Sequence, residues 1–447
     1  MSLHRKRNRN LGLAELVAIA VGGMVGGGIF SVLGISVAMI GTWTPLAIFL
    51  GGILALFASY SYVKLGVYYQ DEGASFSFFR KTYEKSHFAS SVIGWLVVFG
   101  YISTLALYAY TFSSYAISGF AFADNVWIRK IIALAIIAVF TGVNVWSVKG
   151  MGKIEDIIVY TKLSVLLIIS VILIQFGAPN ISSFIGNLSI DAGKAGILGL
   201  LTVSALTFVA YEGFQLVNNA VNEMINPKKN IGRAIYLSLA LVMVIYLVIS
   251  FGAILAIPAK DIIQNKEYAL AAGAGKVLGS LGSALVIFGA LLATSSAISG
   301  TLFGASHQMV VVAENGYMPG VLAKRKKNIP INGVIAMAVI SSLLILVGGL
   351  ELILEFGSIT FLLVSLLMAI ANFKIRKQTK SSPIITMLAI ILLSLGGLLV
   401  LYYESENALN QVVFIIVMYI VIMGIALIYA RKRDRRISIA KRSDERK

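Results

Sequence analysis

The chain has 447 residues, of which 58% are hydrophobic and only 13% charged, and its mean hydropathy is +0.89. Soluble domains are typically about 45–50% apolar and about 25% charged, so this chain has too few charges to cover soluble surfaces. Because the apolar residues also gather in runs of about 20, the length that crosses a bilayer as a helix, composition excludes soluble enzymes, nucleic-acid binders and disordered chains. It predicts a polytopic membrane protein.

The apolar runs predict twelve transmembrane helices and therefore an all-α fold. In chain order we place them at 13–40, 43–68, 90–120, 126–148, 153–177, 195–222, 232–257, 277–313, 332–350, 353–374, 383–403 and 409–430. The third and eighth are long for one crossing, which indicates tilt or extension beyond the bilayer. The runs are apolar on every face, whereas strands of a membrane β-barrel would alternate.

The basic residues predict the orientation of these spans. With a cytoplasmic N-terminus, thirty of the 37 Lys and Arg residues fall on the cytoplasmic side and six outside, as the positive-inside rule requires. Both termini are then cytoplasmic, and the net charge of +17 reflects topology rather than nucleic-acid binding. The basic first ten residues lack a following cleavage site, so we expect no cleaved signal peptide. Short loops and the absence of cysteine favour a prokaryotic plasma membrane.

The first span contains a run of glycines in its middle. A glycine inside a helix costs about 1 kcal/mol relative to alanine. Close packing between helices would explain glycines four residues apart, such as Gly22 and Gly26. Gly26, Gly27 and Gly28 are contiguous, which packing alone does not need, so they predict local unwinding.

The sixth span carries a carboxylate, Glu212, in its middle, at a cost of about 2.5–3.5 kcal/mol on insertion scales. Interrupted helices at corresponding positions of two halves indicate a transporter binding site. We therefore divide the chain into a cytoplasmic tail (1–12), a first five-helix repeat (13–177), an extracellular loop (178–194), a second, inverted five-helix repeat (195–376), two additional transmembrane helices (377–430) and a basic cytoplasmic tail (431–447).

Two unwound helices favour one type of ligand. The N–H groups at the start of a half-helix attract a carboxylate, and the carbonyls at the end of another accept hydrogen bonds from an ammonium. An α-amino acid carries both groups on one carbon atom, so it is the expected substrate.

Four motifs, in chain order, resemble those of the amino acid–polyamine–organocation superfamily. They are GMVGGGIF at 23–30 with Gly34; YSYVKLG at 60–66 followed by DEGASF at 71–76; FVAYEGF at 208–214 followed by NPKKNI at 226–231; and AENGYMP at 313–319. They extend from the first span to the turn after the eighth. The resemblance implies amino-acid transport and the five-plus-five inverted-repeat fold shared with sodium-coupled neurotransmitter symporters (LeuT-type).

The resemblance also implies the substrate-binding residues. The backbone amides of Gly26, Gly27 and Gly28, with Ile29 alongside, would hold the substrate carboxylate. The carbonyls of Val25 and of Phe208, Val209, Ala210 and Tyr211 would receive its amino group. Val209 stands where many relatives have a second aromatic residue. Tyr101 of the third span is our candidate for the wall of the substrate path.

Lys162, inside the fifth span, admits two interpretations. Its ammonium either reaches the cytoplasmic interface by snorkelling or lies buried in a protein cavity. The resemblance favours the second, because proton-coupled relatives carry a lysine where sodium-coupled ones place an ion. This predicts proton coupling without sodium. Glu212 is either structural or a second group that takes up protons, and Ser295 and Ser296 are candidates to ligate a cation or to accept from Lys162.

The sequence thus predicts a secondary active amino acid transporter, proton-coupled and sodium-independent, that works by alternating access. The alternatives are an exchanger of amino acids or polyamines, a channel, and a sensor that binds amino acids without moving them. No metal-ligand or nucleophile motif is present, so we expect no enzyme, cofactor or metal. The expected partners are an amino acid, protons and the lipid bilayer, without nucleic acid; the oligomeric state stays open.

Overall fold

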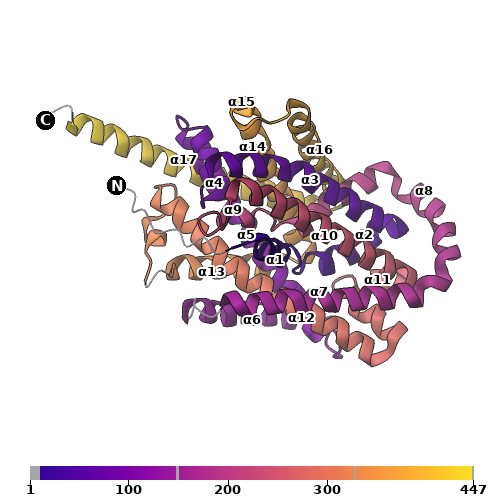
Figure 1. Ribbon diagram of the computed structural model, residues 1–447. Helices are drawn as coiled ribbons and strands as arrows, with labels where there is room; N and C mark the ends of the chain where they lie inside the picture. Colours follow the sequence, from indigo (N-terminus) through magenta and orange to yellow (C-terminus); the bar gives the residue numbers. More distant parts are fainter. Residues whose placement is uncertain (1–10, 147–150, 327–328, 445–447) are drawn as a thin grey trace.

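The protein is a bundle of long helices, seen in a computed structural model that describes residues 11–146, 151–326 and 329–444 (Figure 1). The first helices are α1 (Leu13–Met24), α2 (Gly28–Ile40), α3 (Thr44–Tyr69), α4 (Ala74–Thr82), α5 (His87–Ile117), α6 (Val126–Trp146) and α7 (Met151–Gly177). Then follow α8 (Ile181–Leu206), α9 (Leu216–Asn219), α10 (Pro227–Ala256), α11 (Ala259–Gln264), α12 (Ala269–Glu314), α13 (Ile331–Val347), α14 (Leu350–Lys374), α15 (Arg376–Thr379), α16 (Pro383–Asn407) and α17 (Leu409–Asp444). Four 3-10 turns join them: η1 (Gly41–Trp43), η2 (Ala178–Asn180), η3 (Thr207–Tyr211) and η4 (Gly320–Ala323).

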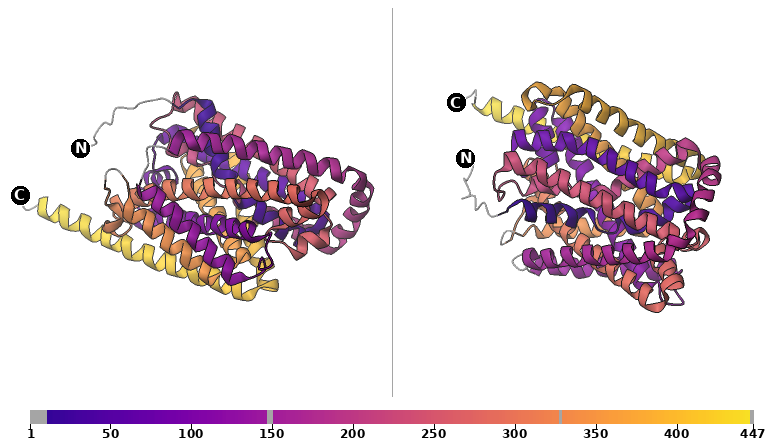
Figure 2. Two further views of the ribbon diagram at one scale, coloured as in Figure 1. Left: turned by 90° about the horizontal axis from the view of Figure 1, so that it is seen from below. Right: turned by 45° about the vertical axis from the view of Figure 1, so that its right-hand side comes forward.

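The all-helical class predicted from the sequence is confirmed for these residues. Ten helical stretches are long and apolar enough to cross a membrane, and α1 and α13 are shorter apolar helices at two further predicted positions. The described chain begins and ends at the same end of the bundle (Figure 2). The count of twelve crossings and the inverted repeats stay predictions.

The helices differ in how much of their surface the protein covers. Almost all of α5 is buried, whereas α6, α16 and α17 bury less than a third of their most apolar windows. In water such exposed apolar faces would be unfavourable, but lipid tails are as apolar as these side chains. The helices around α5 therefore form the packed interior, and α6, α16 and α17 present apolar surface to the bilayer.

Residues 178–194, which we expected to form a loop between two spans, are helical. They make η2 and the first part of α8, and the chain then turns at Gly196, whose φ is +63°. The Asp191 carboxylate accepts hydrogen bonds of 2.9 Å from the backbone N–H and the hydroxyl of Thr42. This helical segment is thereby fixed to the connection between α2 and α3.

The first predicted span is interrupted where the glycine run predicted unwinding. Helix α1 ends at Met24, and α2 begins at Gly28 after three non-helical residues. Contiguous glycines favour such a break because they gain no side-chain packing and lose the most backbone entropy in a helix. The prediction of unwinding in this span is confirmed.

The sixth predicted span is also interrupted, beside its carboxylate. Helix α8 ends at Leu206 and gives way to the turn η3, then Glu212 is extended and Gly213 has φ +132°. Such a φ strains any residue with a side chain. The helical path resumes only in the short α9.

The two breaks meet backbone to backbone. A Cβ atom placed on Gly213 would lie 2.5 Å from the carbonyl carbon of Gly23, and one on Gly28 would lie 2.8 Å from the Cα of Ala210. Carbon atoms in van der Waals contact stay about 3.5–4.0 Å apart. No side chain therefore fits at Gly28 or Gly213. At Gly213 the positive φ is a second reason that only glycine is tolerated.

We expect Gly213→Ala to lower the free energy of unfolding by about 2 kcal/mol or more, because it adds a clash and a strained φ. Thermal unfolding of the purified protein measures this as a fall in melting temperature. Gly142→Ala in α6 is the control, since no atom lies within 4 Å of the Cβ it would add. Equal melting temperatures for the two variants would contradict the close backbone contact at Gly213.

Candidate functional site

The carbonyl groups at the end of α1 are hydrogen-bonded by side chains from three other helices. The last four carbonyls of a helix have no partner within it. Lys162 of α7 donates to the carbonyls of Gly22 (2.9 Å) and Val25 (2.6 Å). Tyr108 of α5 donates to Gly23 (3.2 Å) and Tyr246 of α10 to Met24 (2.8 Å).

Lys162 is fully buried, and its ammonium lies against the end of α1. In this structure the Lys162 ammonium therefore does not snorkel to the membrane interface. A cation is favourable at a helix C-terminus, where the helix dipole places partial negative charge. Lys162 thus joins α7 to the first break.

Tyr246 connects the two breaks. Its hydroxyl lies 2.8 Å from the carbonyl oxygen of Met24 and 3.1 Å from that of Ala210. One hydroxyl has one proton to donate, so these carbonyls share a single donor. Nothing in the sequence singled out Tyr246, because a lone tyrosine in an apolar span resembles a core residue.

The start of α2 faces the second break. The first N–H groups of a helix lack intrahelical partners, and Gly28 at this start packs against Ala210. The Ser31 hydroxyl donates back to the carbonyl of Gly27 (2.9 Å) and lies 2.5 Å from the hydroxyl of Thr111. The predicted substrate-binding residues that are buried here are Val25, Gly26, Gly27, Gly28, Ile29, Phe208, Val209, Ala210 and Tyr211. The structure therefore brings the two predicted backbone segments together.

The Glu212 side chain is buried at the second break with one hydrogen-bonded oxygen. Its Oε2 accepts from the Gln215 amide (2.7 Å), while Gln215 Oε1 accepts from the N–H of Gly213 (3.0 Å). Glu212 Oε1 has no hydrogen-bond partner among the described residues. The Gln215 amide is also 3.4 Å from the Tyr101 hydroxyl, which brings Tyr101 beside this carboxylate. Gln215 was not predicted, since an amide near a helix break has no distinctive spacing.

The two serine candidates of the eighth predicted span lie on α12. Ser296 is buried, and its hydroxyl has no hydrogen-bond partner in the described part of the chain; Ser295 is partly buried. Their suggested role as ligands of a cation stays a prediction.

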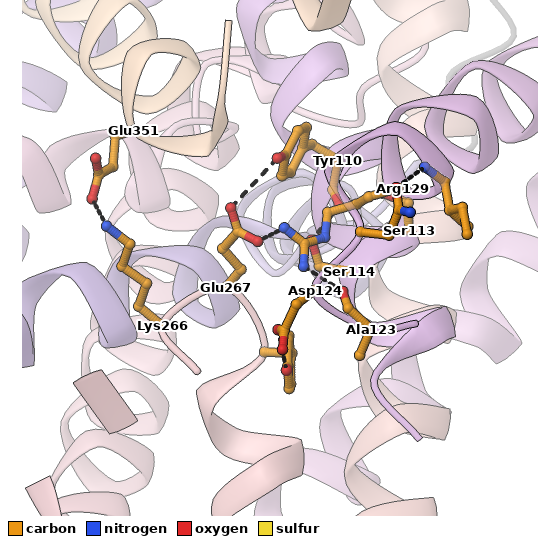
Figure 3. A network of polar contacts seen from close by, with 12 residues as sticks. Tyr110, Ser113, Ser114, Ala123, Asp124, Arg129, Lys266, Glu267 and Glu351 are labelled. Carbon is orange, nitrogen blue, oxygen red and sulfur yellow. Dashed lines mark hydrogen bonds and ion pairs between the residues drawn. The ribbon is translucent and has the colours of Figure 1, made fainter. Parts of the chain in front are cut away.

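A second polar network lies away from the breaks, where α5, α6 and α14 meet the loop that leads into α12 (Figure 3). Arg129 and Glu267 point toward one another and form an ion pair, and the Tyr110 hydroxyl is 3.4 Å from the same carboxylate. The neighbouring Lys266 pairs with Glu351 of α14. These contacts fix the loop to three helices, and they could not be predicted from the sequence because their partners are distant in the chain.

Comparison with known proteins identifies the family. A model of the family described as amino acid permease matches residues 11–438. An uncharacterized protein of Methanocaldococcus jannaschii is 29% identical over 97% of this chain and 98% of its own length. The inner membrane transport protein YbaT of Escherichia coli is 27% identical over 91% of this chain and 94% of its own. The large neutral amino acids transporter small subunit 2 of Oryctolagus cuniculus is 27% identical over 70% of this chain and 59% of its own.

These matches confirm the resemblance inferred from the four motifs, and the family model covers nearly the whole described chain. The protein is a multi-pass membrane protein that belongs to the amino acid permease family.

Proposed function

We propose that the protein is a secondary active transporter that moves an amino acid across the plasma membrane by alternating access, coupled to protons and independent of sodium. The observation that carries this proposal is the backbone-to-backbone meeting of the two interrupted helices at Gly23 and Gly213. Relatives named as transport proteins, one of them for large neutral amino acids, support the substrate class.

The substrate lies between the two breaks in this proposal. Its carboxylate accepts from the N–H groups of Gly26, Gly27 and Gly28, where the dipole of α2 favours an anion. Its ammonium meets carbonyls of residues 208–211. The Val25 carbonyl, our other candidate for the ammonium, already accepts from Lys162, so a substrate ammonium there shares the oxygen with the lysine. Tyr101 and Ile29 line the site.

Lys162 couples transport to protons in this proposal. Its ammonium supplies the positive charge at the end of α1, in the place where sodium-coupled relatives would hold an ion. When it loses its proton, the carbonyls of Gly22 and Val25 lose a cationic donor, and α1 is free to move relative to α7. Glu212 is the second candidate for proton exchange, and Ser295 and Ser296 lie on the helix that would complete a cation site.

The same proposal includes the topology. Both termini are cytoplasmic, the two repeats comprise 13–177 and 195–376, and the last two spans lie outside the repeats. The excess of basic residues in the loops assigned to the cytoplasm supports this orientation.

We expect ligand binding to need both ends of the amino acid. A ligand at about a hundred times its dissociation constant adds about 2.7 kcal/mol of stability, so the amino acid that binds is the one that raises the melting temperature in a screen of the twenty. Its carboxamide, which lacks the carboxylate, and its N-acetyl form, which lacks the ammonium, should give no rise. Equal stabilisation by either analogue would contradict a site built from both breaks.

We expect Lys162→Ala to abolish the response of uptake to a pH gradient while the protein still exchanges substrate. Wild-type protein in liposomes should accumulate substrate when the outside is acidic and sodium is absent. Removing the ammonium leaves two carbonyls without hydrogen bonds to a charged group, each worth about 1.5–3 kcal/mol.

Lys64→Ala is the matched control, because Lys64 also donates to a backbone carbonyl, that of Lys380 (2.9 Å), but at an exposed position. It should keep the response to pH. An unchanged response in Lys162→Ala, or an absolute need for sodium in the wild type, would refute the proposed coupling. Counterflow without net accumulation in the wild type would instead identify an exchanger.

A further inference from the structure

Two carboxylic side chains of neighbouring helices are buried together. Glu355 belongs to α14 and Glu404 to α16, and each is only 5% exposed. Neither forms an ion pair with a Lys, Arg or His residue within the described ranges. Burying a charge without a partner costs far more than burying a neutral group, so two unpaired charges at this place would be strongly unfavourable.

The two carboxyl groups lie within hydrogen-bonding reach of each other. An ionised carboxylate only accepts hydrogen bonds, and a carboxyl group donates only when it is protonated. A bond between Glu355 and Glu404 therefore needs a proton on one of them. Glu355 Oε2 has no hydrogen-bond partner among the residues described, which leaves an acceptor without compensation if this side chain is the ionised one.

The surroundings supply further negative charge and a path to water. Glu351, one turn before Glu355, interacts with both carboxyl groups and is paired with Lys266. Glu351 also lines a cavity of about 420 Å³ between the ends of α14 and α17. Glu351 therefore places the wall of this cavity about one helical turn from Glu355.

Glu406 of α16 is exposed and Lys374 lies at the far end of α14, so the other titratable groups nearer the pair on these helices are tyrosines. Tyr403 precedes Glu404 on α16, and Tyr419 of α17 bonds to Thr360 of α14 (2.9 Å). Tyr62 of α3 and Tyr101 of α5 contact α14 further along, at Ser365 and Phe361. None of these supplies a positive charge that would hold two carboxylates ionised.

Both helices that carry the pair touch the chain just before the second break. The Ser358 hydroxyl of α14 lies 3.0 Å from the carbonyl oxygens of Ala205 and Leu206 at the end of α8. On α16, a Cβ atom at Gly396 would lie 3.2 Å from the side chain of Ala205. A change in the distance between α14 and α16 is therefore transmitted to the residues that lead into η3.

We propose that Glu355 and Glu404 share one proton and form a proton-binding site, separate from Lys162, that holds α14 against α16 beside the second break. When the proton leaves to solvent, the O–H bond breaks, a water molecule takes the proton as hydronium, the hydrogen bond between the two side chains is lost, and two carboxylates remain in contact. Their repulsion in a medium of low dielectric moves α14 and α16 apart. The role in transport rests on the proposed function, whereas the shared proton does not.

Infrared difference spectra of the purified full-length protein in lipid test the shared proton. The wild type at neutral pH should show the C=O band of a protonated carboxylic acid, shifted by deuterium oxide. Glu355→Gln and Glu404→Gln should each lose this band. These variants keep the shape of the side chain, and the amide can donate to the remaining carboxylate, so the fold is retained.

Two control variants make the result specific. Glu406→Gln changes an exposed carboxylate of the same helix and should keep the band. Glu212→Gln should also keep it, which separates the pair from the carboxylate at the break. The comparison is repeated in the Glu212→Gln background, which removes any band from the carboxylate at the break. There, the absence of a protonated carboxyl band, or a band that persists with both Glu355→Gln and Glu404→Gln, would overturn the proposal.

Thermal unfolding across the pH range tests its consequence for packing. The melting temperature of the wild type should fall as rising pH removes the proton, and Glu404→Gln should reduce this fall, while Glu406→Gln follows the wild type. A pH dependence that is the same in all three would show that the pair does not hold α14 against α16. A loss of the pH response of uptake in Lys162→Ala tests the proposed transport mechanism and does not bear on the proton shared by Glu355 and Glu404.

Discussion

The structure depends on one constraint, that a backbone polar group without a hydrogen bond inside a membrane costs several kcal/mol. Two helices are interrupted in the interior, so both breaks expose carbonyls and N–H groups that a continuous helix would satisfy. Lys162 and Tyr108 donate hydrogen bonds to the carbonyls at the end of α1. The Ser358 hydroxyl donates to carbonyls at the end of α8. The Tyr246 hydroxyl lies within hydrogen-bond distance of a carbonyl in each break. These hydrogen bonds thus hold the surrounding helices against the two breaks.

The same constraint explains why the breaks can bind a polar ligand. Glycines at positions 23, 28 and 213 let the two interrupted chains approach until their backbones touch. The start of α2 then packs directly against the second break at Ala210. In the proposed mechanism an amino acid completes hydrogen bonds that the interruption left open, and protonation of Lys162 decides how firmly α1 is held.

The sequence alone supports the all-helical membrane fold, the family and the positions of both breaks. The breaks were predictable because a glycine run and an intramembrane glutamate are unfavourable in a continuous helix and need a reason. Tyr246 and the Arg129–Glu267 ion pair were not predictable, since each acts through a partner far away in the chain. Gln215 was not predictable because an amide near a helix break has no distinctive spacing. The helical form of the connecting segment 178–194 was not predicted either.

The most direct test of the account is an experimental structure of the protein with the stabilising amino acid bound. The account predicts density for the amino acid between residues 25–29 and 208–211, with its carboxylate on the N–H groups of Gly26, Gly27 and Gly28. An amino acid bound elsewhere, such as in the cavity beside Glu351, with the two breaks still in direct contact, would contradict the claim that the breaks form the substrate site.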